Sequence, residues 1–328
     1  MERNLEILTN VWKSVQDIPA NISRKISFRL NLQRRPELND VENVVSYVRG
    51  NIANVVDYYV GNLPIVYLLP DVHKNMSMQF HNVSIIDKLA QRLGLDLVGV
   101  EGFSGNVDQT ALEDIVKKAN AKIKEQQGTI TILYTLDSIA AVKSYLRYAL
   151  NNSKVELVGL EYPELYEKAL LIDEAMSLYN KIFERASKLL TKKQFREIRE
   201  EEGGLKKLFD IGQATLDSFI RAFEEEYVPF LEKFPFKDEL PDYKESLKEV
   251  SVVESVSFVP SGSSFYRALL KLCNKYIILE RSLGVADKAI EESQVRGKQQ
   301  IAVTFGRGHI PQISHALRDR NVSYIVMI

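Results

Sequence analysis

Two short apolar runs, far apart in the chain, share one layout. Each has β-branched residues, a turn of three residues and a histidine, and they read IVYLLPDVH at 65–73 and IAVTFGRGH at 301–309. A short apolar run that stops at a turn is typical of a strand buried on both faces. Each copy is followed by an amphipathic stretch and a second apolar run. The pattern predicts an α/β fold with a mainly parallel sheet built from two related strand-helix-strand units.

The expected helices and strands of these units follow from the spacing of apolar residues. Gly94 is placed to end the first helix, because glycine readily adopts the left-handed conformation at helix C-termini. The first unit is predicted as strand 63–69, helix 76–93 and strand 95–100, and the second as strand 301–305, helix 310–320 and strand 322–328. Between them we expect a short strand or turn at 129–134, a helix at 138–150 and a strand at 155–160.

The remaining sequence divides the chain into regions. Residues 1–62 mix short amphipathic stretches with polar turns and predict a mostly helical N-terminal lead-in. Residues 163–249 are rich in Leu, Glu and Lys with helical periodicity, which predicts a large helical insert or cap. The α/β core is therefore expected from 63–162 and 250–328, and it includes a long helix at 263–293.

Composition excludes some partners and environments. Lys and Arg total 43 and Asp and Glu total 44, so the net charge of -1 gives no field that attracts nucleic acid or an anionic membrane. The N-terminus lacks the pattern of a signal peptide and no apolar run reaches membrane-spanning length, which predicts a cytoplasmic protein. Cys273 is the single cysteine, and we expect it to pack in a helix. Formation of a homo-oligomer stays open.

Four polar residues lie just past the C-terminal ends of predicted strands. His73 and His309 end the two repeated turns, while Glu101 follows LDLVGV and Glu161 follows VELVGL. In open parallel sheets, ligands bind beyond the carboxyl ends of the strands, where several loops meet. We therefore expect these two imidazoles and two carboxylates to form one site.

This set of residues allows two chemical routes. His73, Glu101 and His309 could ligate a divalent metal such as zinc, manganese or cobalt, which would activate a bound water. Without a metal, a histidine could act as general base, and Arg281 or Arg307 could stabilise a developing oxyanion.

The other histidines and small-residue motifs are weaker candidates. His81 could join the site if residues 76–93 began as a loop, whereas His315 is expected on a helix face. Residues 260–264 (PSGSS) are expected to start a helix. GRGH lacks the third glycine of a dinucleotide-binding loop, and the chain has no Walker A lysine pattern.

With its turns PDVH (70–73) and GRGH (306–309) and the segment VGVEG (98–102), the chain resembles the superfamily of Tiki proteases, TraB proteins, erythromycin esterases and ChaN haem-binding proteins. LERSLGVADKAI (279–290) also resembles the arginine-bearing segment that precedes the second histidine in this group, and Arg281 matches that arginine. GLEYPELY (159–166) is a further match. Pro70 departs from the pattern, because glycine is usual there.

The resemblance implies a peptidase-like or esterase-like hydrolase that acts on a small molecule or peptide. Members of the group differ in activity, so two alternatives stay open. One is a protein that binds haem or another small ligand in the same cleft. The other is a non-catalytic TraB-like regulatory or scaffold protein whose helical insert docks a partner.

Overall fold

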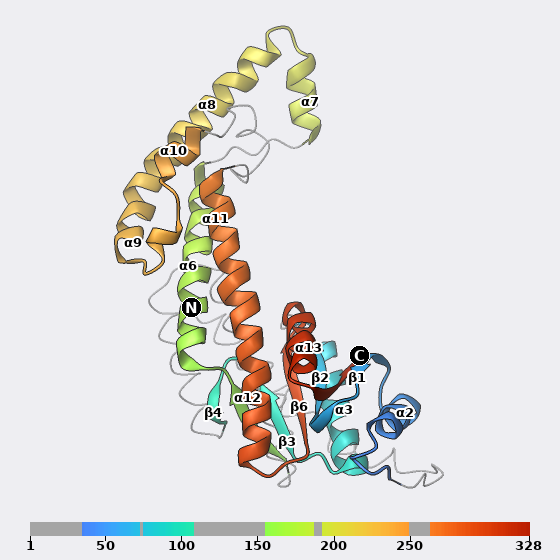
Figure 1. Ribbon diagram of the computed structural model, residues 1–328. Helices are drawn as coiled ribbons and strands as arrows, with labels where there is room; N and C mark the ends of the chain where they lie inside the picture. Colours follow the sequence, from blue (N-terminus) through green and yellow to red (C-terminus); the bar gives the residue numbers. More distant parts are fainter. Residues whose placement is uncertain (1–34, 73–74, 108–154, 187–191, 249–262) are drawn as a thin grey trace, which may run out of the picture. The chain divides into compact units, whose positions relative to one another are not determined.

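A seven-stranded sheet organises the part of the chain that the structure describes. The structure is a computed structural model, and it describes residues 35–72, 75–107, 155–186, 192–248 and 263–328 (Figure 1). The strand order is β1-β7-β2-β6-β3-β5-β4. The strands are β1 (Val55–Tyr59), β2 (Asn62–Asp71), β3 (Leu97–Val100), β4 (Ser104–Asn106), β5 (Glu156–Leu160), β6 (Gln300–Gly306) and β7 (Val322–Met327).

The interior of the sheet is parallel. β2 pairs in parallel with β6 and β7, and β3 pairs in parallel with β5 and β6, while β1 and β4 are antiparallel edge strands. The two repeated runs form β2 and β6, which are hydrogen-bonded neighbours with Asp71 opposite Gly306. The predicted α/β class with two related strand-helix-strand units is confirmed. The first unit is β2, helix α3 (Met76–Leu93) and β3, and the second is β6, helix α13 (Ile310–Asp319) and β7.

Helices cover both faces of this sheet because alternate residues of each strand point to opposite faces. Along β2, Ile65 and Tyr67 pack in one core with helices α2 (Val41–Asn51) and α3 (Met76–Leu93). Val66 and Leu68 pack in the other core with α12 (Arg281–Val295) and α13 (Ile310–Asp319). This double cover explains why the strands are continuous apolar runs in the sequence.

Local sequence signals set the ends of several elements. The side chain of Asn75 accepts a hydrogen bond from the Met78 amide at the start of α3. Gly94 ends that helix in the left-handed conformation, with φ of 72°. Ser263 accepts a hydrogen bond from the amide of Tyr266 at the start of α11, as expected for a helix-initiating serine.

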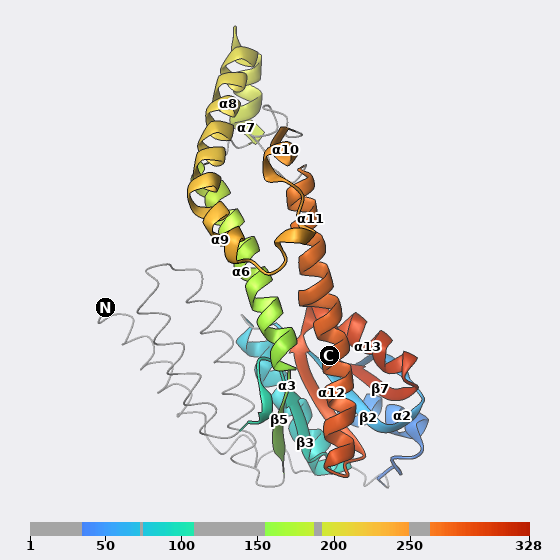
Figure 2. The ribbon, with the colours of Figure 1, turned by 60° about the vertical axis from the view of Figure 1, so that its left-hand side comes forward.

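The helical insert lies between β5 and β6 in the sequence and has its own aromatic core. Tyr179, Phe219 and Phe265 belong to this core, and α6 runs alongside the helix formed by α11 and η5 (Figure 2). The helices within 163–249 are α6 (Pro163–Ala186), α7 (Lys192–Glu200), α8 (Gly204–Ala222), η2 (Phe223–Tyr227), α9 (Val228–Lys233), η3 (Lys237–Glu239) and α10 (Tyr243–Lys248). Two helices from the region 250–328, α11 (Ser264–Leu272) and η5 (Cys273–Glu280), pack in the same aromatic core.

The helix expected at 263–293 has a π-helical segment in its middle. It runs through α11, the π-helix η5 and α12. The apolar periodicity of a sequence does not reveal such a change of helix type, so this segment was not expected. Cys273 is half-buried at its start, and burial raises the pKa of its thiol to about 11, in keeping with a packing role.

Several sequence-based expectations fall outside the described residues. The elements expected at 129–134 and 138–150 do so, as does most of the lead-in, so the predicted domain boundaries stay predictions. Residues 36–62 contribute α2 and the edge strand β1. Among the helices that the structure describes, none has the length and apolar character needed to cross a bilayer.

Gly159 in β5 provides a test of this packing. A Cβ built on Gly159 would lie 2.2 Å from the backbone carbon of Phe103, and backbone cannot move aside as a side chain does. We expect Gly159→Ala to lower the free energy of unfolding by about 1–3 kcal/mol, measured by urea denaturation. Gly50→Ala is the control, because its Cβ meets no atom within 4 Å. Equal stability of the two variants would contradict the close approach of β4 and β5.

Candidate functional site

A buried arginine joins two carboxylates at the carboxyl end of the sheet. Arg281, the first residue of α12, is only 9% exposed. Its Nε donates to both carboxylate oxygens of Glu161, at 3.0 Å each. Its Nη2 donates to Oε1 of Glu101 at 2.9 Å and also to Oε1 of Glu161. One guanidinium group therefore fixes the positions of both glutamates.

The strand order explains why these glutamates meet. Glu101 follows β3 and Glu161 follows β5, and these two strands are parallel neighbours. Backbone amides hold each carboxylate from a second side. The Gly306 N–H donates to Oε2 of Glu101 at 2.7 Å, and the Gly102 N–H donates to Oε1 of Glu161 at 3.3 Å. The glutamates are thus anchored to three adjacent strands, β6, β3 and β5.

The electrostatics of the group reflect its burial. Burial raises the pKa of Glu161, and Arg281 opposes that shift by pairing with the carboxylate. Burial alone would lower the pKa of Arg281, but Glu161 and Glu101 raise it, so the guanidinium stays charged. The rings of Tyr166 and Phe305 lie 5.4 and 5.1 Å from its central carbon and add cation–π contacts.

His309 borders the same group of charges. It ends the 3-10 turn η6 (Arg307–His309), is 7% exposed and packs edge-on against Phe305 with ring centres 4.9 Å apart. Its Nδ1 lies 2.9 Å from Oγ of Ser282. A Cβ built on Gly306 would lie 3.3 Å from Oε2 of Glu101 and 3.4 Å from Cδ2 of His309. Oε2 of Glu101 and Cδ2 of His309 therefore both lie close to Gly306.

The structure brings together four of the six residues predicted for the centre: Glu101, Glu161, Arg281 and His309. Arg307 is exposed on η6, next to the site in sequence. His73 lies outside the described residues, so its place in the site stays a prediction.

The other two histidines lie on exposed helix surfaces. His81 is an exposed residue of α3, which is helical from Met76, so the loop that would have carried it into the site is not formed. His315 is exposed on α13, as expected, with its Nε2 3.5 Å from Asp319.

Two residues that shape the candidate site are not predicted from the sequence. Ser282 follows Arg281 directly, but nothing in the sequence shows that a serine on this helix meets a histidine after β6. For Gly306, the sequence indicates only a place in the GRGH turn. Its amide donor and its missing side chain both matter, because a larger residue would crowd Glu101 and His309.

The donors described so far do not complete a metal site. In the described ranges, no three His, Cys, Asp or Glu side chains are grouped so that they could hold a metal ion. Glu101 already accepts hydrogen bonds from Arg281 and Gly306. A metal held by His73, Glu101 and His309 therefore depends on the position of His73, which lies outside the described residues.

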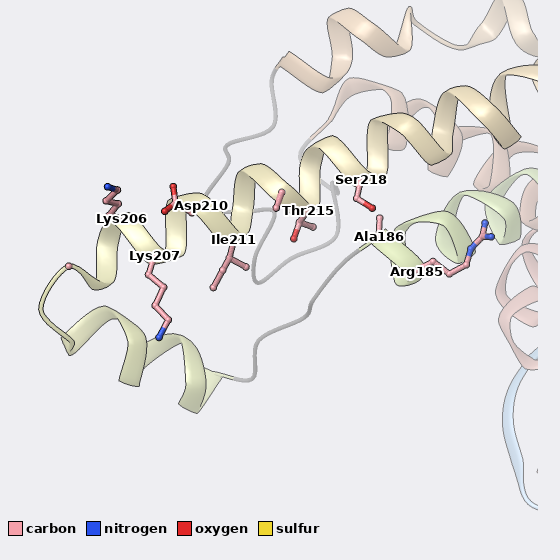
Figure 3. A pocket seen from close by; sticks show the side chains of 10 residues that line it. Arg185, Ala186, Lys206, Lys207, Asp210, Ile211, Thr215 and Ser218 are labelled. Carbon is pink, nitrogen blue, oxygen red and sulfur yellow. The ribbon is translucent and has the colours of Figure 1, made fainter.

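A separate hollow of about 730 Å³ lies in the helical insert (Figure 3). None of the predicted site residues is among those that line it. Two of its charged residues have acidic partners, since Arg185 pairs with Glu226 and Lys207 pairs with Glu201. It is a surface hollow between helices. The carboxylates, the arginine and the histidine of the candidate site do not line it.

Comparison with known proteins assigns no family to this chain. No family model and no curated protein matches the sequence. A crystal structure of a protein from Bacillus cereus aligns over 89% of this chain and 68% of its own, with 9% sequence identity and a TM-score of 0.28. A likeness this weak assigns no function. The resemblance to the Tiki and TraB superfamily therefore stays a prediction.

The buried ion pair predicts a specific pattern of stability. Arg281→Met leaves two buried carboxylates without their cation, so we expect the free energy of unfolding in urea to fall by about 3–5 kcal/mol. Glu161→Gln in the same chain removes one of those charges. The double variant should therefore lose less unfolding free energy than the two single variants lose together, by about 1 kcal/mol or more.

Arg320→Met is the matched control, because Arg320 pairs with Asp287 at an exposed position. Exposed pairs contribute only about 0–1 kcal/mol. Equal losses of unfolding free energy in Arg281→Met and Arg320→Met would mean that the Arg281 ion pairs do not hold β3, β5 and β6 together.

Proposed function

We propose that this chain is a hydrolase of ester or peptide bonds in which His309 is the general base. The observation that carries the proposal is the buried group of Arg281, Glu101 and Glu161 beside His309, at the edge of the sheet where α/β proteins bind ligands. Such a constellation of a histidine and fixed charges suits the activation of water for attack on a carbonyl carbon.

The charge balance of the group supports this role for His309. Two carboxylates and one guanidinium leave a net charge of minus one next to the imidazole when both glutamates are ionised. This charge favours the imidazolium that forms when His309 takes a proton from the attacking water. Arg281 acts here chiefly by holding Glu101 in place, since its Nε and Nη2 are already bonded to carboxylates.

A metal-assisted route is the alternative within the same proposal. A divalent metal bound by His73, Glu101 and His309 would supply a bound water of lowered pKa. This route depends on the position of His73, whereas the metal-free route uses only residues that the structure describes. We therefore propose that His309 acts without a metal.

The proposal is tested with protein that carries no histidine tag, on p-nitrophenyl esters and a fluorogenic peptide library. We expect turnover of at least one class, and His309→Ala should lower kcat about 10²- to 10⁴-fold. His315→Ala is the control, because this histidine is exposed on α13 and should leave kcat unchanged.

Chelation separates the two routes. Activity that persists in EDTA is the expected result, while activity lost in EDTA and restored by zinc, manganese or cobalt would establish the metal route instead. Absence of turnover in the wild type, or a His309→Ala variant as active as the wild type, would refute the proposal.

A further inference from the structure

Ser282 makes two contacts that together decide where the proton on His309 lies. It is the second residue of α12 and is fully buried. Its Oγ donates to the backbone carbonyl of Ile278, one turn earlier, and lies 2.9 Å from Nδ1 of His309. The first contact is the usual bond from a helical serine to the carbonyl four residues before it.

The single hydrogen of the Ser282 hydroxyl fixes the direction of the hydrogen bond between Ser282 and His309. A carbonyl oxygen only accepts, so the single hydroxyl hydrogen of Ser282 is used in the bond to Ile278. The hydroxyl oxygen can then only accept from the imidazole. Nδ1 of His309 must therefore carry a proton, and in a neutral imidazole the other nitrogen, Nε2, carries the lone pair.

We infer that Ser282 is a positioning residue that holds neutral His309 in the Nδ1–H tautomer, so that Nε2 is its basic nitrogen. The ring orientation agrees with this assignment. Nδ1 faces Ser282, while Cδ2, which is bonded to Nε2, lies on the side of Gly306 and Glu101. The catalytic role of this tautomer rests on the proposed function, whereas the tautomer itself is inferred from the two contacts of Ser282 alone.

The acceptor of the serine lies in the π-helical segment. Ile278 belongs to η5, which packs against α6 of the insert and also touches the turn that carries His309. The proton position on His309 is thereby linked to the local geometry of the long helix, because a shift of Ile278 would release the hydroxyl hydrogen of Ser282.

The tautomer is measured directly by long-range ¹H–¹⁵N NMR on protein labelled with ¹⁵N-histidine. The chain has four histidines, and the signal of His309 is identified by its loss in His309→Gln. At about pH 8, where an unperturbed imidazole is neutral, we expect Nδ1 to be protonated and Nε2 to be unprotonated. An Nε2–H tautomer of the neutral ring would overturn the inference.

Two variants separate positioning from packing. Ser282→Ala removes the acceptor, and the ring should shift toward the Nε2–H tautomer that histidine favours in water, while Ser282→Thr should keep the wild-type pattern. With a hydrolysed substrate, Ser282→Ala should lower kcat about tenfold or more with little change in KM, and Ser282→Thr should restore it. A Ser282→Ala variant that keeps the wild-type tautomer would refute the role of Ser282.

The two proposals can fail separately. If the wild type hydrolyses nothing but shows the Nδ1–H tautomer, then the hydrolase proposal is wrong and the assignment of Ser282 stands. If it hydrolyses substrate with His309 in the Nε2–H tautomer, then the assignment of Ser282 is wrong while the hydrolase proposal stands.

Discussion

The ion pair of Arg281 with Glu161 and Glu101 is the interaction on which the arrangement of the site depends. A buried charge is costly unless it is paired and hydrogen-bonded, so the three side chains and the amides that bind them must be present together. Through these bonds α12 is tied to the ends of β3, β5 and β6. His309 is positioned next to this group by its contacts with Ser282 and Phe305.

The helical insert is connected to the site through the long helix that follows it, formed by α11, η5 and α12. Arg281 and Ser282 open α12, directly after the π-helix that packs against α6. The two side chains that form hydrogen bonds with the carboxylates and with Nδ1 of His309 thus come from the helix that returns the chain from the insert to the sheet. Any change in the insert that moves this helix along its axis would move both side chains.

Much of the fold could be predicted because its signals are local. The apolar run of β2 and the glycine that ends α3 are readable in the sequence, and Glu101 and Glu161 were found by one rule, that polar residues after parallel strands gather at one edge. Ser282 could not be found this way, because its contact with His309 depends on the rotation of a long helix about its axis. The π-helical segment helps to set that rotation, and apolar spacing does not encode it.

The most direct test of this account is a crystal structure that includes the turn after β2. Because β2 and β6 are neighbouring parallel strands, about 4.8 Å apart, we predict that the imidazole of His73 lies within about 10 Å of that of His309, with Arg281 bridging Glu101 and Glu161. Imidazoles that lie farther apart, or an Arg281 side chain that points into solvent, would contradict the claim that the repeated turns and the buried ion pair form one centre.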